Sequence, residues 1–147
     1  MKYDNDLFYT CSLIEYIGRQ QKLKRSDVVL ALGEEAICRI YRYADVFHCE
    51  MIEKTANEFI EERAVPSGVF DNVGVCRYEV PDYWTIGEVY ERLIEDVAPE
   101  GEENPLPTLK EVYTSWIDGA ISNYNSDFFY QPRDYLRECY LAGAVLA

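Results

Sequence analysis

Apolar residues recur along this chain at the three- and four-residue spacing of amphipathic helices. The pattern is unbroken in 86–97 and 108–124, and Thr85 and Thr108 are suitable N-caps for these two segments. The same periodicity indicates further helices over 4–22, 26–33, 34–45, 50–63 and from Pro132 onward. The sequence therefore predicts an all-α bundle of six or seven helices, in which 86–97 and 108–124 contribute to one core.

Short polar residues, glycine and proline indicate where several of these helices begin and end. Asp4 is a suitable N-cap for the first helix, and Ser26 for a short second helix that stops at Gly33. Pro132 suits the first turn of the last helix, since proline lacks the N–H that such a position leaves unpaired.

Two segments interrupt the helical pattern. Residues 65–84 contain prolines and glycines, and the alternation of Cys76, Tyr78 and Val80 with charged residues suggests a short β-hairpin. A loop of this length is often functional in a compact domain. Residues 98–107 form an acidic, Pro-rich linker, and the residues after it are too few for a separate core. We therefore expect one helical domain over 1–147.

The charge of the chain is strongly acidic, with a net value of −13. Over residues 1–48 seven basic side chains balance seven acidic ones, so all of the net charge is carried by residues 49–147. Nucleic acids and anionic membranes attract Lys- and Arg-rich surfaces, so this balance argues against binding either one directly. The five cysteines include no CxxC pair, and no signal peptide or membrane-length apolar run is present. These features predict a reduced, soluble, cytoplasmic protein.

The sequence offers few residues for histidine- or metal-based chemistry. His48 is its single histidine, and with Asp45 it forms half of a di-metal carboxylate pattern that lacks the second histidine. Cys49 beside it raises the alternative of a thiol nucleophile, but sequence neighbours point in different directions. The spacing of the five cysteines does not fit a zinc site. We therefore expect them to be small, buried hydrophobic residues. We predict no catalytic residue, no cofactor and no metal, with His48 closing the third helix.

Two features favour a protein-binding surface. Glu88, Glu91 and Glu95 recur on the solvent side predicted for helix 86–97, where they form either a solvated face or a docking face. Many aromatic residues follow position 124, and core packing explains most of them. Three consecutive rings cannot all point inward from one turn, so at least one should be exposed. The predicted partner-binding residues are thus Phe128, Phe129, Tyr130, Glu88, Glu91 and Glu95. If all three rings are buried, the 65–84 loop is the next place to look.

Three stretches resemble a family of small, uncharacterised bacterial proteins sometimes encoded near toxin–antitoxin-like genes. They are LIEYIGR at 13–19, RIYRYADVFHCE at 39–50 and ISNYNSDFFYQPRDYL at 121–136. Some neighbouring genes in that family encode ADP-ribosyltransferase-like products. The resemblance implies a helical intracellular protein and a partner that it neutralises. It supplies no catalytic residues.

The leading hypothesis from the sequence is a non-enzymatic, acidic protein-interaction module of the antitoxin, immunity or inhibitor kind. Its partner would be a protein, with a basic surface favoured, and self-association of the chain is left open. A second hypothesis is an acidic mimic of nucleic acid that inhibits a nuclease or a phage-defence effector. A third is a carboxylate-based, metal-assisted enzyme.

Overall fold

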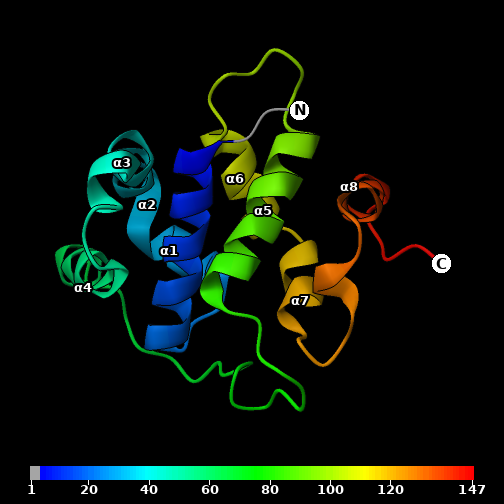
Figure 1. The fold of residues 1–147 in the computed structure, drawn as a ribbon, viewed down its shortest axis with the longest axis horizontal. Coiled ribbons are helices and arrows are strands. Elements are labelled where there is room, and N and C mark those ends of the chain that lie inside the picture. Colours follow the sequence, from blue (N-terminus) through cyan, green and yellow to red (C-terminus); the bar gives the residue numbers. More distant parts are fainter. Residues whose placement is uncertain (1–3) are drawn as a thin grey trace.

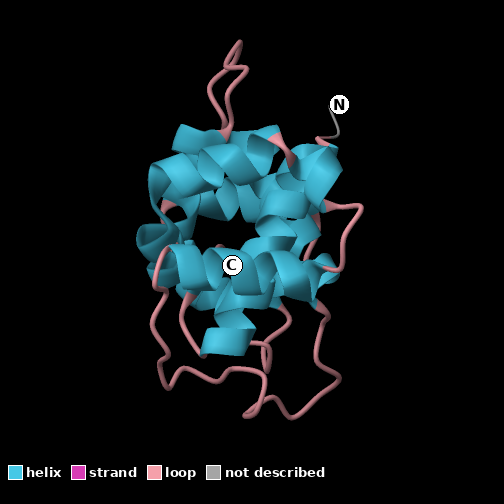
Figure 2. Ribbon diagram, turned by 90° about the vertical axis from the view of Figure 1, so that its left-hand side faces the viewer, coloured by secondary structure: helices cyan, strands magenta, loops and turns pink. Residues whose placement is uncertain are grey.

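In the computed structural model, which describes residues 4–147, helices are joined by turns and two longer loops (Figure 1). Within these residues there are eight α-helices and one turn of 3-10 helix, η1, and no strand (Figure 2). Their bounds are α1 Asn5–Gln21, α2 Arg25–Arg42, α3 Ala44–Phe47, α4 Ile52–Glu62, α5 Tyr83–Val97, α6 Leu106–Tyr113, α7 Ile117–Ser122, η1 Phe128–Tyr130 and α8 Arg133–Ala142. The all-α prediction is confirmed, with slightly more helices than expected.

Helices α1 and α5 lie side by side at the centre of the fold (Figure 1). Their close approach requires glycine at position 87, because a Cβ atom there would lie 2.0 Å from Oγ of Ser12. Around this pair, α2 and α4 pack on α1, whereas α6 and α8 pack on α5. The final helix therefore packs back on α5, from the outer side of the central pair (Figure 1).

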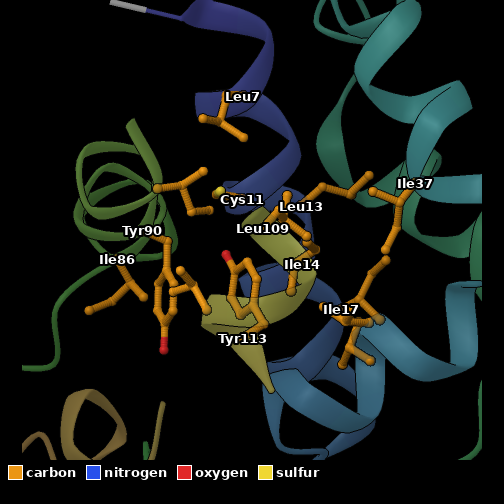
Figure 3. Packing of buried hydrophobic residues seen from close by; sticks show 14 of the residues in the cluster. Leu7, Cys11, Leu13, Ile14, Ile17, Ile37, Ile86, Tyr90, Leu109 and Tyr113 are labelled. Carbon is orange, nitrogen blue, oxygen red and sulfur yellow. The ribbon is translucent and has the colours of Figure 1, made fainter. Parts of the chain in front are cut away.

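The core between α1, α5 and α6 combines aliphatic side chains with a stacked pair of tyrosines. Leu7, Cys11 and Ile14 of α1 point towards α5 and α6 (Figure 3). The rings of Tyr90 and Tyr113 stack with centroids 4.2 Å apart, and their hydroxyl groups point in opposite directions (Figure 3). The two hydroxyl groups of this pair therefore lie at different places in the core.

The two helices expected over 26–33 and 34–45 form one kinked element, α2. Gly33 is the kink, with a φ of 81° that side-chain-bearing residues rarely adopt. Nε of Arg63 donates to the carbonyl oxygen of Leu32 at 2.9 Å, next to this break. Ser26 is not the cap, since the helix begins at Arg25 after an N-cap residue, Lys24, without a capping side-chain bond.

The helix predicted over 108–124 is broken into α6 and α7, so this part of the prediction is wrong. The break has a local cause in two hydroxyl side chains. Oγ1 of Thr114 donates to the carbonyl of Lys110 at 2.6 Å, and Oγ of Ser115 donates to that of Val112 at 2.7 Å. The backbone N–H of Ile117 donates to Ser115 in turn, at 3.3 Å. Such side-chain bonds compete with the helical ladder.

Helix caps agree with the sequence at α1 but differ at α5, α6 and α8, as they do at α2. Asp4 accepts from the backbone N–H of Leu7 at 3.0 Å, as expected. The cap of α5 is Asp82, which accepts from the N–H of Thr85 at 2.7 Å, so Thr85 lies inside the helix. Likewise α6 begins before Thr108, at Leu106, and Pro132 directly precedes α8.

The hairpin suggested for 65–84 is absent, because the backbone of this loop bonds to other parts of the chain. The N–H groups of Gly68 and Phe70 donate to the last carbonyls of α1 and the residue after it, at 2.8 and 2.9 Å. Farther on, the side chain of Asn72 donates to the carbonyl of Ser122 at 2.9 Å. The loop thus runs from the end of α1 to the end of α7 before it enters α5.

None of the helices within residues 4–147 is both long and apolar enough to cross a membrane.

Candidate protein-binding surface

The three consecutive aromatic residues lie on η1, between α7 and α8. Phe128 and Phe129 are buried, whereas Tyr130 is 65% exposed. The expectation that at least one ring is exposed is therefore confirmed for Tyr130, and the other two rings belong to the core.

Polar side chains define the turn that leads to these rings. The N–H of Asn125 donates to Oδ1 of Asn123 at 3.1 Å, and Oγ of Ser126 donates to the Asn123 carbonyl at 2.9 Å. Phe129 then packs edge-on against Tyr124, with centroids 5.6 Å apart, and Tyr130 packs edge-on against Phe129 at 5.0 Å. Buried rings thus fix the place at which Tyr130 leaves the core.

A groove between α5 and α8 brings three of the predicted residues together, Glu88, Phe129 and Tyr130. It has a volume of about 200 Å³, and both rings form part of its lining. Glu88 of α5 lines the same groove, 3.4 Å from Nη2 of Arg92. The predicted acidic and aromatic elements meet here, although the charge of Glu88 is partly offset by its arginine.

A second hollow lies on the other side of Tyr130, where the 63–82 loop meets the turn. It has a volume of about 520 Å³ and is lined by aromatic and polar side chains: Tyr78, Glu79, Tyr124, Asn125, Ser126, Asp127, Phe129 and Tyr130. The backbone N–H of Arg77 donates to Oδ1 of Asn125 at 2.7 Å, and Nδ2 of Asn125 donates to the carbonyl of Val75 at 3.2 Å. This amide holds the loop against the turn.

Glu91 and Glu95 do not belong to an exposed acidic face. Glu91 is fully buried, and Glu95 is largely covered, with Arg133 at 3.4 Å and the backbone N–H of Asp4 donating to it at 2.9 Å. Only Glu88 of the three remains open to a partner. Reversing all three charges together would place a lysine in the core at position 91, so it would not leave the helix intact.

The carboxyl group of Glu91 is unusual in being buried without a basic partner in hydrogen-bond contact among residues 4–147, and its neighbour is the carboxyl group of Glu95. Burial, together with the neighbouring carboxylate of Glu95, raises the pKa of Glu91 to about 9. The group therefore carries a proton at neutral pH and adds no charge to the surface.

A second buried polar cluster underlies the hollow and is fully paired. Nη1 of Arg25 donates to Oδ1 of Asp118 at 2.9 Å and to Oγ of Ser122 at 2.6 Å, and its Nε donates to Oε1 of Glu15. The hydroxyl of Tyr124 accepts from Nη2 of Arg25 at 2.6 Å and donates to Oε2 of Glu15 at 2.8 Å. The hydroxyl of Tyr90 donates to Asp118 as well.

Charges in this cluster balance. Nε of Arg19 pairs with Oε2 of Glu15 at 2.7 Å, so two arginines face two carboxylates. Burial alone would lower the pKa of Arg25, but Glu15 and its other partners raise it above its ordinary value. Burial alone would likewise raise the pKa of Glu15, and the two arginines lower it. We refer to Arg25, Glu15, Arg19, Asp118, Tyr90, Ser122 and Tyr124 as the Arg25 cluster.

His48 follows α3 as its C-cap residue, so it closes this short helix and not the helix predicted over 34–45, which forms the second part of α2 and ends at Arg42. The ring of His48 is exposed but lies against Trp84, with centroids 5.7 Å apart, and against Tyr9 at 5.4 Å. No group of three or more His, Cys, Asp or Glu side chains among residues 4–147 is arranged to hold a metal ion. The expectation of buried cysteines holds only for Cys11 and Cys139, since Cys49 is exposed and the other two are half-buried.

Comparison with known proteins adds no relative: no family model, no curated protein and no solved structure matches this chain. The residues that sequence reasoning missed at the surface are Tyr78, Glu79 and Asp127. The 65–84 loop was singled out as a second place for an interface, but nothing in the local pattern linked Tyr78 to Tyr130. That link depends on contacts between residues almost fifty positions apart.

Proposed function

We propose that this protein is a non-enzymatic interaction module that binds a protein partner through the surface on both sides of Tyr130. The observation that carries the proposal is an exposed tyrosine held by buried rings between two hollows. Tyrosine on a rigid support contributes a large contact area at little entropic cost, and such residues dominate many interfaces.

The charge of the chain favours a partner with a basic surface. A net charge of −13 would speed the encounter with such a partner at low ionic strength. The resemblance to proteins encoded near toxin–antitoxin-like genes supports a toxin or other effector as the first partner to test. Because Glu91 is sealed from solvent, its perturbed carboxyl group does not support the alternative of a carboxylate-based enzyme.

The test is capture of proteins from the native host with wild-type bait and with two tyrosine variants. Tyr130→Ala should lose the partner, whereas Tyr43→Ala should retain it. Tyr43 is a matched control because it is 48% exposed and precedes α3, on the opposite side of the molecule from α8 (Figure 1). Thermal melts of both variants should match wild type.

Two outcomes would overturn the proposal. Equal capture by wild type and Tyr130→Ala would place the interface elsewhere. A captured nuclease whose binding falls steeply with salt but ignores Tyr130→Ala would instead favour the acidic mimic of nucleic acid.

A further inference from the structure

The hollow formed by the 63–82 loop and the turn before η1 has the composition of a site for a cation. Two buried rings, Tyr124 and Phe129, form part of its lining, and two exposed tyrosines, Tyr78 and Tyr130, each 65% exposed, stand at its margin. Aromatic faces attract guanidinium and ammonium groups through their electron-rich centres.

Two carboxylates, Glu79 and Asp127, complete the lining, and no basic side chain lines it. Both are exposed, and neither forms an ion pair with any residue in 4–147. This distinguishes them from Glu88 in the α5–α8 groove, where Arg92 supplies a cation. The hollow therefore combines aromatic surface with two carboxylates that form no ion pair within residues 4–147, although Arg77 lies near the ring of Tyr78.

The chain itself shows which cation such tyrosines take. Cζ of Arg77 lies 6.0 Å from the ring centroid of Tyr78, and Cζ of Arg19 lies 5.7 Å from that of Tyr124. A guanidinium group is planar, so it stacks on a ring while its N–H groups bond to carboxylates in a fork.

We propose that this hollow receives an arginine side chain of the protein partner, with the tyrosines contacting the guanidinium plane and Glu79 and Asp127 accepting its hydrogen bonds. The inference rests on the proposed function, to which it adds the chemistry that the partner must present. It also assigns a role to the 65–84 loop, whose length alone drew attention in the sequence.

The test uses NMR titration of the full chain with a blocked peptide, acetyl-Gly-Gly-Arg-Gly-Gly-amide, followed through the ring signals of Tyr78 and Tyr130. Matched peptides carry lysine or citrulline, the neutral isostere of arginine, in place of the arginine. We expect saturable shifts of both tyrosines with the arginine peptide and affinity lower by about tenfold with citrulline, since the charge is lost.

Variants locate the site. The double change Glu79→Gln and Asp127→Asn should raise the Kd of the arginine peptide by about tenfold, and Tyr130→Ala by about three- to fivefold. The control is Glu102→Gln with Glu103→Gln, which removes two exposed charges from the 98–105 loop at the opposite end of the molecule (Figure 1). Circular dichroism should confirm that all variants keep their helices.

Three results would overturn the assignment: equal shifts with arginine and citrulline peptides, equal affinity for the lysine peptide, or an equal loss of affinity in the Glu102/Glu103 control. The inference and the proposed function fail separately. A partner that is lost with Tyr130→Ala but unaffected by the Glu79/Asp127 double variant leaves the interface standing without its arginine site. A peptide response without any effect of Tyr130→Ala on capture leaves the arginine site and removes the proposed interface.

Discussion

The two buried polar regions of this fold solve the same problem in opposite ways. At the Arg25 cluster every charge has a partner of opposite sign, whereas neither oxygen of Glu91 is in hydrogen-bond contact with a basic group in residues 4–147. A buried ion needs hydrogen-bonded counter-charges to offset its desolvation, and a lone carboxyl group avoids that cost by keeping its proton. Glu15 is therefore stabilised in the fold as a charged carboxylate, and Glu91 as a protonated carboxyl group.

The stacked tyrosines give a second comparison of a paired and an unpaired polar group. Tyr90 donates its hydroxyl to Asp118 in the Arg25 cluster. Tyr113, whose ring stacks on that of Tyr90, has a buried hydroxyl whose polar neighbour is the thiol of Cys11, a weak hydrogen-bonding group. Changes at Arg25, at Glu91 and at the two tyrosine hydroxyls therefore test how this fold accommodates buried polar groups.

The largest effect is expected from Arg25→Met. Removing one member of a buried ion pair leaves the others uncompensated, which costs about 3–5 kcal/mol in the free energy of unfolding. Urea denaturation monitored by circular dichroism measures this loss. The control is Arg42→Met on the same helix, where an exposed arginine forms no ion pair within residues 4–147 and the loss should stay within about 0.5 kcal/mol. Equal stability of the two variants would mean that the cluster does not hold the helices together.

Glu91→Gln should change how stability depends on pH. The pKa of Glu91 is about 9 in the folded protein and close to 4.5 when the chain is unfolded. Between these values the unfolded state releases the proton that the folded state keeps, so Glu91 makes the wild type less stable as pH rises. The slope from this one group is at most about 1.4 kcal/mol per pH unit. Below pH 4.5 both states hold the proton, so the variant should match wild type there.

Denaturation curves of wild type and Glu91→Gln between pH 4 and pH 9 measure this difference. The variant should become progressively more stable than wild type as the pH rises. Parallel profiles would contradict a buried, protonated Glu91.

The smallest effects are expected from removing single hydroxyls of the stacked pair. Tyr90→Phe deletes the donor to Asp118 and should cost about 1.5–3 kcal/mol, the value typical of a bond to a charged group. Tyr113→Phe deletes a hydroxyl that has only the weakly hydrogen-bonding thiol of Cys11 beside it, so the change should be close to neutral. Both keep the ring stack, so the difference between their unfolding free energies isolates the hydroxyls. Equal losses would show that Tyr113 is paired as well as Tyr90.

The sequence predicted the helices better than it predicted their surroundings. Helical periodicity identified α5, and the turn before η1 correctly indicated that at least one of the three consecutive rings is exposed, which is Tyr130. The same periodicity placed Glu91 in solvent, because it finds the most apolar face of a helix and α5 is covered by α1, α6, α8 and η1. A central helix has more than one buried face, and the chain's order of residues does not say which helices will be central.

Local pattern also failed where long-range hydrogen bonds decide the backbone. The alternation around Tyr78 is typical of a strand, yet Asn125 bonds to both Val75 and Arg77 and holds this part of the loop instead. The break between α6 and α7 could have been predicted from the sequence, since Thr114 and Ser115 are poor helix formers whose hydroxyls bond to nearby carbonyls.

The spacing of the Arg25 cluster along the chain bears on the order in which the protein acquires its structure during synthesis. Glu15 precedes Arg25 by ten positions, whereas Asp118, Ser122 and Tyr124 follow it by 93, 97 and 99. At ribosomal rates of about 5–20 residues per second, roughly 5–20 s pass before these partners have been made. Until then the nascent α2 carries an arginine that cannot be buried at its final place, so closure of the core around α1 awaits the last quarter of the chain.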